Sequence, residues 1–414
     1  MGAPYDTYQI INYEFIHEKN GSHRLIFQDE LDGEQTYLLV STESIRKPDH
    51  MEFVNVGRLK GSDMEADLII ITARDFLEAV EPLKIRRNTQ GLRTEIVVVE
   101  DIFDEFSYGQ IDPGAIRSFL TYAYENWIPP APEYVLLFGD ANLDFKDYLA
   151  TGKISRVPAY LSLTQPLGLT PDDNWYACVQ GNDFLPDMMI GRLPGQSSED
   201  VAAVVEKIGR YEDSGSLSPR RVLLVADNND ILFEQINDNM IPFLPGNFSI
   251  KKVYLRRYTS MDQATEDIID GINRGALVTN YMGHGAFTNW AGEFVFHSPD
   301  VLRLENPDRL TMAVTLNCLN GYFASPVQYS LAEEFLLPND KGAIGCFSAS
   351  GLGYPWEHRI LDENFFSNLF LDGITGMGLL TTQAKIQAFA RGARVETVTM
   401  FTLIGDPSMN LKSW

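Results

Sequence analysis

Short apolar runs rich in β-branched residues recur through this chain, and segments with helical spacing separate them. Residues 67–72, 95–99 and 134–138 are three such runs, with predicted helices at residues 76–83 and 113–124. Strands that are apolar on both faces are typical of sheets covered by helices on both sides. The alternation of strands and helices therefore predicts an α/β fold with a mainly parallel sheet.

The same plan restarts after a polar segment at residues 214–219. Predicted strands at residues 221–226 and 252–255 alternate with predicted helices at residues 233–240 and 262–274. The repeat predicts two tandem α/β subdomains, the first over residues 63–215 and the second over residues 216–414.

Residues 1–62 have a different pattern. Aromatic and β-branched residues fill residues 8–15, 23–27 and 35–40, and the turn signals Asn20-Gly21 and Asp32-Gly33 separate them. We predict a small β segment here, an adjunct or the remnant of a β-domain.

Two predicted strands of the second subdomain end in residues with reactive side chains. The run at residues 276–279 leads into Gly283-His284-Gly285, and the run at residues 312–314 leads into Asn317-Cys318. Ligands bind at the carboxyl ends of parallel strands, and a thiol beside a base is a nucleophile. Taken singly, a buried cysteine and a turn histidine are the simpler interpretations. Together, with glycines that allow a substrate backbone to approach, they favour a Cys–His site.

These runs resemble the catalytic signature of the gingipain family of cysteine peptidases, family C25. The resemblance rests on residues 280–285, Trp290, Glu293 and residues 316–323, and on further segments at residues 135–142, 171–176, 190–194, 330–335, 342–345 and 403–408. It implies a caspase-like fold in each of the two subdomains, with catalysis in the second. It also implies an extracellular or cell-surface protein with neighbouring domains in a longer natural chain.

The chemistry of peptide hydrolysis assigns roles to these residues. Cys318 would attack the peptide carbonyl as a thiolate, and His284 would keep the thiol reactive and protonate the leaving amine. The N–H groups of Gly285 and Cys318 are the candidate oxyanion donors. Asp227, which ends the run at residues 222–226, is the candidate for orienting the histidine, with Asp230 as the alternative. Capping of the following helix explains Asp227 equally well.

The family's substrate preference points to a further pair of residues. The resemblance implies cleavage after a basic residue, and Trp356 and Glu357 follow the predicted strand at residues 342–348. Trp356 would form a wall of the substrate pocket and Glu357 would pair with a basic side chain, although Trp356 is also explained as a buried aromatic. The adjacent His358 is assigned no role.

Composition limits the partners and cofactors. The 33 basic and 57 acidic residues give a net charge of −24, which argues against nucleic acid and anionic membranes. The three cysteines form neither a disulfide framework nor a zinc pattern. No apolar run is long enough to span a membrane, and residues 1–4 begin no secretion signal. We therefore expect protein or peptide substrates.

No cofactor and no catalytic metal are predicted. Calcium as a structural ion is one interpretation of the carboxylates of Asp172, Asp173, Asp183 and Asp187, because calcium prefers oxygen ligands and the family often binds it. Residues 139–142 also end a strand in polar residues, much as Gly283-His284 do.

Three other functions compete with the predicted cysteine endopeptidase. The first is a catalytically silent gingipain-like module for adhesion or protein assembly. The second is a nucleotide binder, but no GxGxxG or GxxxxGKS run follows a strand. The third is a metal-dependent hydrolase, for which the six scattered histidines make a poor ligand set.

Overall fold

The computed structural model contains two compact units, residues 1–54 and residues 55–414. It describes residues 10, 12–29, 37, 39–40, 51, 53–54, 57–165, 167–215, 219–412 and 414. The predicted subdomain boundary at residue 215 is not tested by this division and stays a prediction.

The first unit contains one described hairpin. β1 (Tyr13–His17) pairs antiparallel with β2 (His23–Phe27). Gly21 in the connecting turn has φ 85°, a left-handed conformation that glycine adopts without strain. The predicted strand at residues 23–27 and its turn are confirmed, whereas most of residues 30–40 lie outside the described part of the chain.

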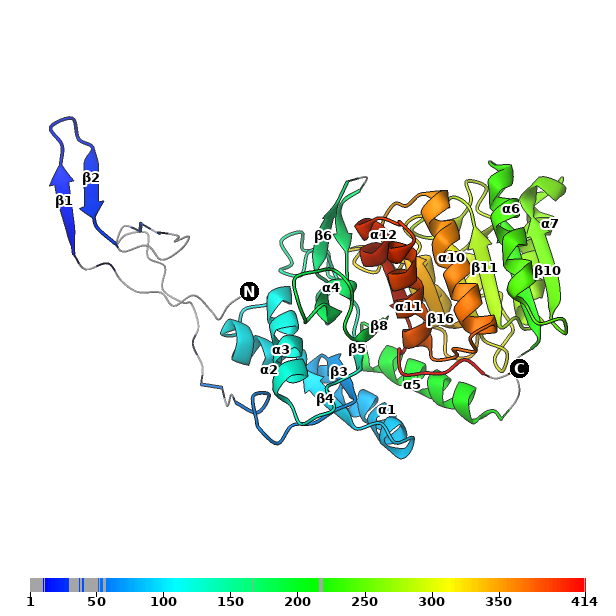
Figure 1. The fold of residues 1–414 in the computed structure, drawn as a ribbon, viewed down its shortest axis with the longest axis horizontal. Coiled ribbons are helices and arrows are strands. Elements are labelled where there is room, and N and C mark those ends of the chain that lie inside the picture. The colour runs from blue at the N-terminus through cyan, green and yellow to red at the C-terminus, as the bar shows by residue number, and fades with distance from the viewer. Residues whose placement is uncertain are drawn as a thin grey trace. The chain divides into compact units, whose positions relative to one another are not determined.

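The second unit is built on one ten-stranded sheet (Figure 1). Its strands, in spatial order, are β10 (Ser249–Tyr254), β9 (Arg221–Ala226), β11 (Val278–Met282), β15 (Thr311–Leu316), β16 (Ala343–Ala349), β17 (Phe401–Ile404), β8 (Met189–Leu193), β5 (Tyr134–Phe138), β3 (Leu68–Thr72) and β4 (Thr94–Val98). The predicted α/β class with a mainly parallel sheet is confirmed. The strands of the two predicted subdomains are joined in this single sheet where β17 pairs with β8.

The sheet consists of two parallel blocks that run in opposite directions. β10, β9, β11, β15 and β16 are parallel to one another, whereas β17 is antiparallel to β16. β17 is in turn parallel to β8, β5, β3 and β4. The carboxyl ends of the two blocks therefore lie at opposite edges of the sheet. Residues 139–142, which follow β5, are thus at the edge opposite His284, so the similarity between these two strand ends does not place them together.

Helices cover both faces of the sheet, as their mutual contacts show. One layer contains α6 (Ile231–Met240), α10 (Pro355–Phe370), α11 (Met377–Ala390), α12 (Val395–Met400) and α4 (Asn174–Ala177), followed by α3 (Pro113–Asn126) and α2 (Val99–Ser107). The other layer contains α7 (Met261–Asn273), α8 (Ser298–Val301), α9 (Leu331–Leu336), α5 (Ser198–Asp213) and α1 (Leu77–Thr89). Short 3-10 turns lie at η1 (Arg74–Phe76), η2 (Ile241–Phe243) and η3 (Leu255–Arg257).

Two small sheets flank the main one. β12 (Gly285–Ala286), β13 (Asn289–Trp290) and β14 (Phe296–His297) form an antiparallel meander directly after His284. β6 (Leu161–Thr164) and β7 (Gly168–Pro171) form a separate antiparallel hairpin.

The core follows the alternation of the strands. In β3, Leu68 and Ile70 belong to one buried cluster, whereas Ile69 and Ile71 belong to another. Successive side chains of a strand point to opposite faces, so the two clusters lie on opposite faces of the sheet at β3. In the other half of the sheet the first cluster includes both faces, with residues such as Phe233 of α6 and Ile268 of α7. This is the two-sided burial that the continuous apolar runs predict.

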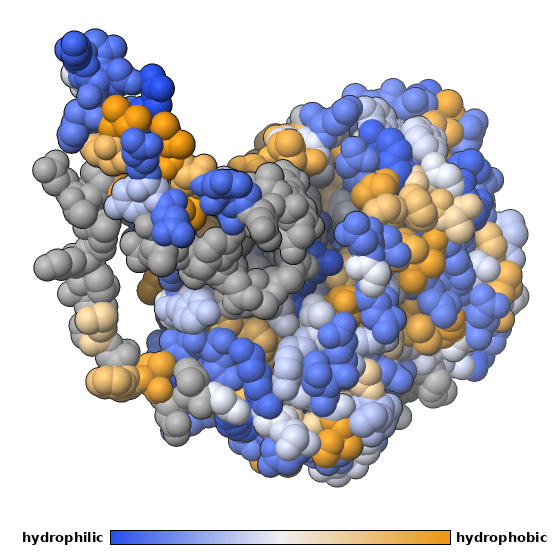
Figure 2. Space-filling view, turned by 60° about the vertical axis from the view of Figure 1, so that its left-hand side comes forward, coloured by the Kyte–Doolittle hydropathy of each residue, from blue (hydrophilic) through white to orange (hydrophobic). Residues whose placement is uncertain are grey.

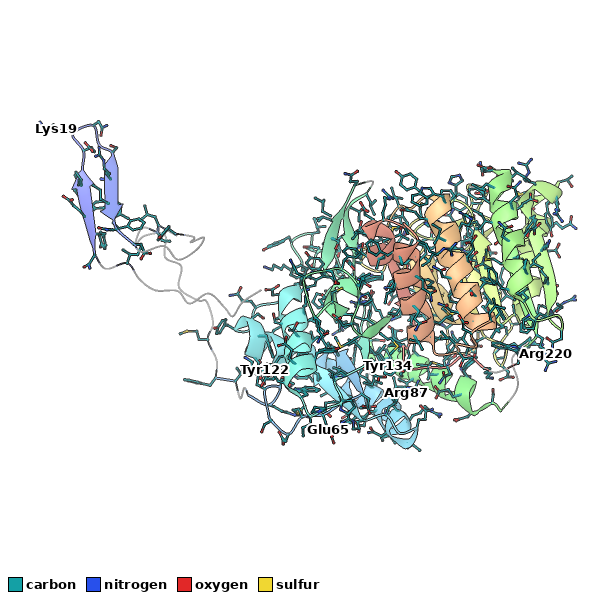
Figure 3. All side chains as sticks on the ribbon, viewed as in Figure 1. Lys19, Glu65, Arg87, Tyr122, Tyr134 and Arg220 are labelled. Carbon is teal, nitrogen blue, oxygen red and sulfur yellow. The ribbon has the colours of Figure 1, made fainter. Side chains whose placement is uncertain are left out.

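A buried ion pair ties the beginning of this unit to its end. Arg87 of α1, labelled in Figure 3, contacts Asp406 through Nη2 at 2.7 Å and Glu212 of α5 through Nη1 at 2.8 Å. Arg87 and Asp406 are fully buried. The segment at residues 403–408 therefore has a structural role.

The helix predictions differ in outcome along the chain. Asp112 caps α3 by accepting a hydrogen bond from Gly114 N–H at 2.8 Å, as its place before Pro113 predicts. Helices α10 and α11 were not predicted. α10 buries polar residues such as Glu357, His358 and Asp362 beside its apolar ones, so it lacks the one-sided apolar pattern that identifies a helix.

The face shown in Figure 2 is mainly hydrophilic, and apolar residues are scattered over it. No described helix is both long enough and apolar enough to cross a membrane.

Candidate active site

Three neighbouring strands bring the predicted catalytic residues to one edge of the sheet. In the pairing register, Met282 of β11 lies between Ala226 of β9 and Leu316 of β15. Asp227, Gly283-His284 and Asn317-Cys318 follow these aligned residues directly. The adjacency that the sequence predicts for the histidine and cysteine strands is therefore present.

The backbone of His284 is fixed on both sides. Its N–H donates to Asp227 Oδ2 at 3.0 Å, and its carbonyl accepts from Tyr281 Oη at 2.6 Å and from Ala291 N–H at 2.9 Å. Tyr281 is buried and its ring stacks on Trp290 with centroids 4.6 Å apart. The imidazole is exposed and meets the ring of Phe233 edge-on at 5.5 Å. The loop is rigidly held, while the ring faces the solvent.

Asp227 supports this loop rather than the imidazole. Its fully buried carboxylate accepts from Asn228 N–H at 2.6 Å and from His284 N–H at 3.0 Å. The predicted contact with the ring is therefore replaced by a contact with the backbone. The alternative, Asp230, caps α6 through a hydrogen bond from Leu232 N–H at 2.9 Å.

Cys318 is the only one of the three cysteines, all within the described residues, that is partly exposed. Cys178 and Cys346 are buried, and burial raises the pKa of each thiol to about 12. Burial also raises the pKa of the Cys318 thiol, while a hydrogen bond from the Gly353 backbone opposes this shift. Because only a thiolate is an effective nucleophile, Cys318 is the one cysteine suited to react.

The imidazole and the thiol are not hydrogen-bonded to each other in the described part of the chain. Burial raises the pKa of the Cys318 thiol, which favours the neutral thiol over the thiolate. Catalytic hydrogen bonds are often long before substrate binds. The geometry therefore fits a histidine that takes the proton during the attack rather than a preformed ion pair.

The segment after Cys318 is anchored to the end of β16. Leu319 has φ 66°, a left-handed conformation that is strained for a branched side chain. Its N–H donates to Gly351 O at 3.1 Å, and Gly321 N–H donates to Ala349 O at 2.9 Å. No hydrogen bond within the described residues occupies the N–H of Cys318, which leaves it available to an oxyanion.

The histidine and cysteine loops are packed against each other at Gly285. A Cβ at this position would lie 2.2 Å from Asn317 Nδ2 and 3.0 Å from Cys318 O. The side-chain amide of Asn320 adds a second link by donating to the carbonyls of Ala286 and Asn289. Asn317 and Asn320, to which the sequence assigned no function, therefore hold the two loops in register.

We expect Gly285→Ala to reduce peptide hydrolysis by about 100-fold without unfolding the protein, because a displacement of about 1 Å at a reacting group has effects of that size. The matched control is Gly292→Ala in the neighbouring loop, where a Cβ would meet nothing within 4 Å. Initial rates on one peptide substrate and thermal melting of both variants test this expectation. Full activity of Gly285→Ala would contradict the close packing of the loops.

The two predicted pocket residues have different environments. Trp356, in the first turn of α10, is 45% exposed, so a wall of the pocket stays a prediction for it. Glu357 is fully buried, and its Oε1 and Oε2 accept from Arg394 Nε and Nη2 at 2.8 and 3.0 Å. Although burial opposes ionisation, these hydrogen bonds hold the pKa of Glu357 below its usual value. Both oxygens are occupied, so Glu357 does not fit the predicted pairing with a substrate.

The first half of the unit reaches this edge through the β6–β7 hairpin. Ser350, directly after β16, donates from Oγ to Pro171 O at 2.6 Å. A Cβ at Gly351 would touch Thr170 Cγ2 at 3.1 Å. The hairpin carries Leu163 and Leu169, which face each other across its two strands and are 81% and 57% exposed.

The four carboxylates considered for calcium have separate partners. Asp173 pairs with Arg192, Asp172 accepts from Ser162 Oγ, Asp187 from Val179 and Gln180 N–H, and Asp183 from Leu185 N–H. Among the described residues no three His, Cys, Asp or Glu side chains are grouped as metal ligands. The carboxylates do not fit a common ion, and calcium stays a prediction.

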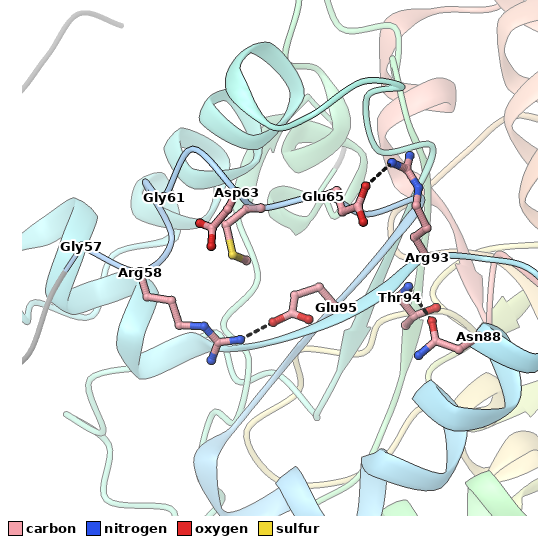
Figure 4. A pocket seen from close by; sticks show the side chains of 10 residues that line it. Gly57, Arg58, Gly61, Asp63, Glu65, Asn88, Arg93, Thr94 and Glu95 are labelled. Atoms are coloured by element: carbon pink, nitrogen blue, oxygen red, sulfur yellow. Dashed lines mark hydrogen bonds and ion pairs between the residues drawn. The ribbon is translucent and has the colours of Figure 1, made fainter.

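A cavity of about 590 Å³ lies elsewhere, at the start of β4 (Figure 4). The residues that line it include two ion pairs, Arg58–Glu95 and Arg93–Glu65. β4 is six strands from β15, a separation of roughly 29 Å at normal strand spacing. This cavity is therefore separate from the Cys–His site.

Comparison with known proteins identifies the family. Residues 62–412 match peptidase family C25. The chain belongs to this family. The predicted resemblance is thereby confirmed over most of the second unit, and the match begins close to the end of the predicted β segment.

Other C25 peptidases are distant in sequence. Gingipain R2 of Porphyromonas gingivalis is 26% identical over 375 residues, which cover 84% of this chain and 46% of that protein. Lys-gingipain W83 of the same organism is 22% identical, over 69% of this chain and 16% of its own length. The chain thus spans about half or less of these longer relatives.

Solved C25 structures share the fold. The Arg-specific cysteine proteinase gingipain R superposes with a TM-score of 0.70 at 23% identity, covering 87% of this chain and 81% of that one. The complex of Porphyromonas gingivalis RgpB pro- and mature domains gives 0.69 at 24% identity, covering 84% and 80%. The predicted gingipain-like architecture is confirmed.

Proposed function

We propose that the protein is a cysteine endopeptidase that hydrolyses peptide bonds with Cys318 and His284. The observation that carries this proposal is the contact between their loops at Gly285, which leaves no room for a side chain. Membership of a peptidase family supports it. Cys318 is also the only described cysteine that is partly exposed, which further supports the proposal.

The proposed reaction uses these groups in the following order. His284 accepts the thiol proton as Cys318 Sγ attacks the peptide carbonyl, and the N–H groups of Cys318 and Gly285 stabilise the oxyanion. The tetrahedral adduct collapses to a thioester while His284 gives the proton to the departing amine. Water, deprotonated by His284, then hydrolyses the thioester and restores the thiol. Asp227 acts as a positioning residue through the backbone of His284.

For substrate and location, the proposal draws on the relatives. The relatives include an Arg-specific cysteine proteinase and Lys-gingipains, so a basic residue before the cut is the first preference to test here. Trp356 is the proposed wall of the pocket, and we assign Glu357 no pairing with the substrate because its carboxylate accepts hydrogen bonds from Arg394. We also propose an extracellular or cell-surface location and neighbouring domains, as for longer relatives.

A silent module for adhesion or assembly is the second candidate function. The specific observation in its favour is the raised pKa of the Cys318 thiol, since no hydrogen bond to His284 offsets it. This candidate predicts slow reaction of Cys318 with peptide electrophiles and no turnover.

The deciding experiment combines turnover with labelling. Under reducing conditions the protein is incubated with fluorogenic peptides whose residue before the cut is Arg, Lys or neutral, and separately with the corresponding peptidyl chloromethyl ketones. We expect cleavage and modification at Cys318, read by peptide mass spectrometry, with the same order of preference. Modification without cleavage would favour the silent module, and an equal rate for all peptides would contradict the basic preference.

A further inference from the structure

The hairpin of the first unit brings two histidines into direct contact. His17, at the end of β1, is the pairing partner of His23, at the start of β2. Their Nδ1 atoms lie 2.9 Å apart, although the two residues are six positions apart in the chain. Residues directly opposite each other in an antiparallel pair share one face and have neighbouring Cβ atoms. The pairing register therefore creates a contact that the sequence alone does not reveal.

The hairpin keeps this pair together and accessible. Both histidine side chains are exposed. The ring of Phe15 meets the imidazole of His17 edge-on, with centroids 5.0 Å apart, and stacks on that of His23 at 5.4 Å. In the connecting turn, Asn20 Oδ1 accepts from Ser22 N–H at 2.9 Å and from Ser22 Oγ at 2.7 Å. The two imidazoles are therefore held side by side and can be reached from solvent.

The distance between the two nitrogens fits a shared metal ion. An ion about 2.05 Å from each Nδ1 would bind them at an angle of about 90°, because the nitrogens are 2.9 Å apart. This is the angle between neighbouring ligands in the square-planar or tetragonal complexes of Cu(II) and Ni(II). Tetrahedral zinc would need nitrogens about 3.3 Å apart. Cu(II) is also the divalent first-row ion that such sites bind most tightly.

The nearby charges do not oppose a bound cation. Arg24 pairs with Glu18 at 2.6 Å, and it follows His23 directly, so its side chain leaves the strand on the other face. The whole chain carries a net charge of −24. Among the described residues no third His, Cys, Asp or Glu side chain joins the pair, which leaves the other coordination positions to water.

We propose that His17 and His23 form a two-histidine Cu(II) site on the hairpin. Each neutral imidazole would give the lone pair of Nδ1 to the ion and keep its hydrogen on Nε2. A rotation of the exposed rings would replace the contact between the two nitrogens with two bonds to the metal. The site belongs to the first unit and uses neither Cys318 nor His284, so the proposal does not depend on the peptidase function.

The test is a titration of the full chain with copper(II) sulfate, followed by electron paramagnetic resonance. The chain carries Cys318→Ala, because the partly exposed thiol would compete for the metal. We expect one Cu(II) per chain, with nitrogen couplings from two imidazoles in the pulsed spectrum. His17→Gln and His23→Gln should each weaken binding by about 100-fold, because joining two ligands raises affinity by that order over one.

Two further variants make the result specific. The exchange of His17→Ile with Ile16→His keeps both histidines but puts them on opposite faces of the hairpin, and it should weaken binding as much as His17→Gln. His297→Gln is the matched control, because His297 Nδ1 already contacts Asp300 Oδ2 at 2.5 Å, and its affinity should be unchanged. Couplings from a single imidazole, or unchanged affinity in His17→Gln or in the exchange variant, would overturn the proposal. The two histidines would then only share a hydrogen bond.

Discussion

Cys318→Ala should abolish cysteine-dependent peptide hydrolysis, with a decrease in kcat of at least about 10⁴-fold. Alanine removes the only atom that can form the thioester, and the partial exposure of Cys318 shows that the nucleophile is not part of the packed core. The variant should therefore melt at nearly the wild-type temperature. Hydrolysis of the preferred fluorogenic peptide, followed over hours, gives the measurement.

Cys346→Ala is the appropriate control for this loss. Cys346 is buried in β16, with its Sγ 3.5 Å from Ala332 O, so alanine there leaves a small cavity and costs about 1 kcal/mol of stability without a change in kcat. Residual cleavage by Cys318→Ala that survives a second purification would contradict the assignment of the nucleophile.

Asp173→Asn should produce the largest loss of stability, about 3–5 kcal/mol in the free energy of unfolding. Asp173 binds Arg192 of β8 through two contacts, Nε to Oδ2 at 2.7 Å and Nη2 to Oδ1 at 2.8 Å, and both side chains are at most 1% exposed. Asparagine leaves a buried guanidinium without its counter-charge. Urea unfolding monitored by tryptophan fluorescence measures the change.

Two comparisons make the result specific. Asp101→Asn removes a surface partner of Arg74, whose side chain is 54% exposed, and should cost less than about 1 kcal/mol. The double variant Asp173→Leu with Arg192→Met removes both charges and should recover a large part of the loss. A single Asp173→Asn variant as stable as wild type would show that the ion pair contributes nothing net.

Local patterns predicted the elements better than the way they assemble. The apolar runs around Ile70, Leu136 and Leu224 predict strands because burial on both faces requires apolar residues at every position. The reversal between β16 and β17 is set by a pairing of residues far apart in the chain, such as Cys346 with Ile404. No short-range signal encodes such a pairing.

For the candidate site, too, the local residues were predictable from the sequence, whereas their contacts were not. Cys318 and His284 are identifiable because they occur together at two strand ends, within runs that resemble the catalytic signature of a known family. The group to which a carboxylate binds cannot be predicted from the sequence in this way. Asp227 binds a backbone N–H and Glu357 binds Arg394, 37 residues away in sequence.

Because the two blocks of strands run in opposite directions, a surface hairpin of one block could be exchanged without changing the strands of the other block. The block that carries His284 and Cys318 has the carboxyl ends of its strands at the edge of the candidate site. The other block runs in the opposite direction, and a segment that precedes one of its strands, the β6–β7 hairpin, contacts that edge. Transplanting residues 160–171 from a relative would therefore alter the surroundings of a bound peptide and leave the thiol and imidazole on their own strands.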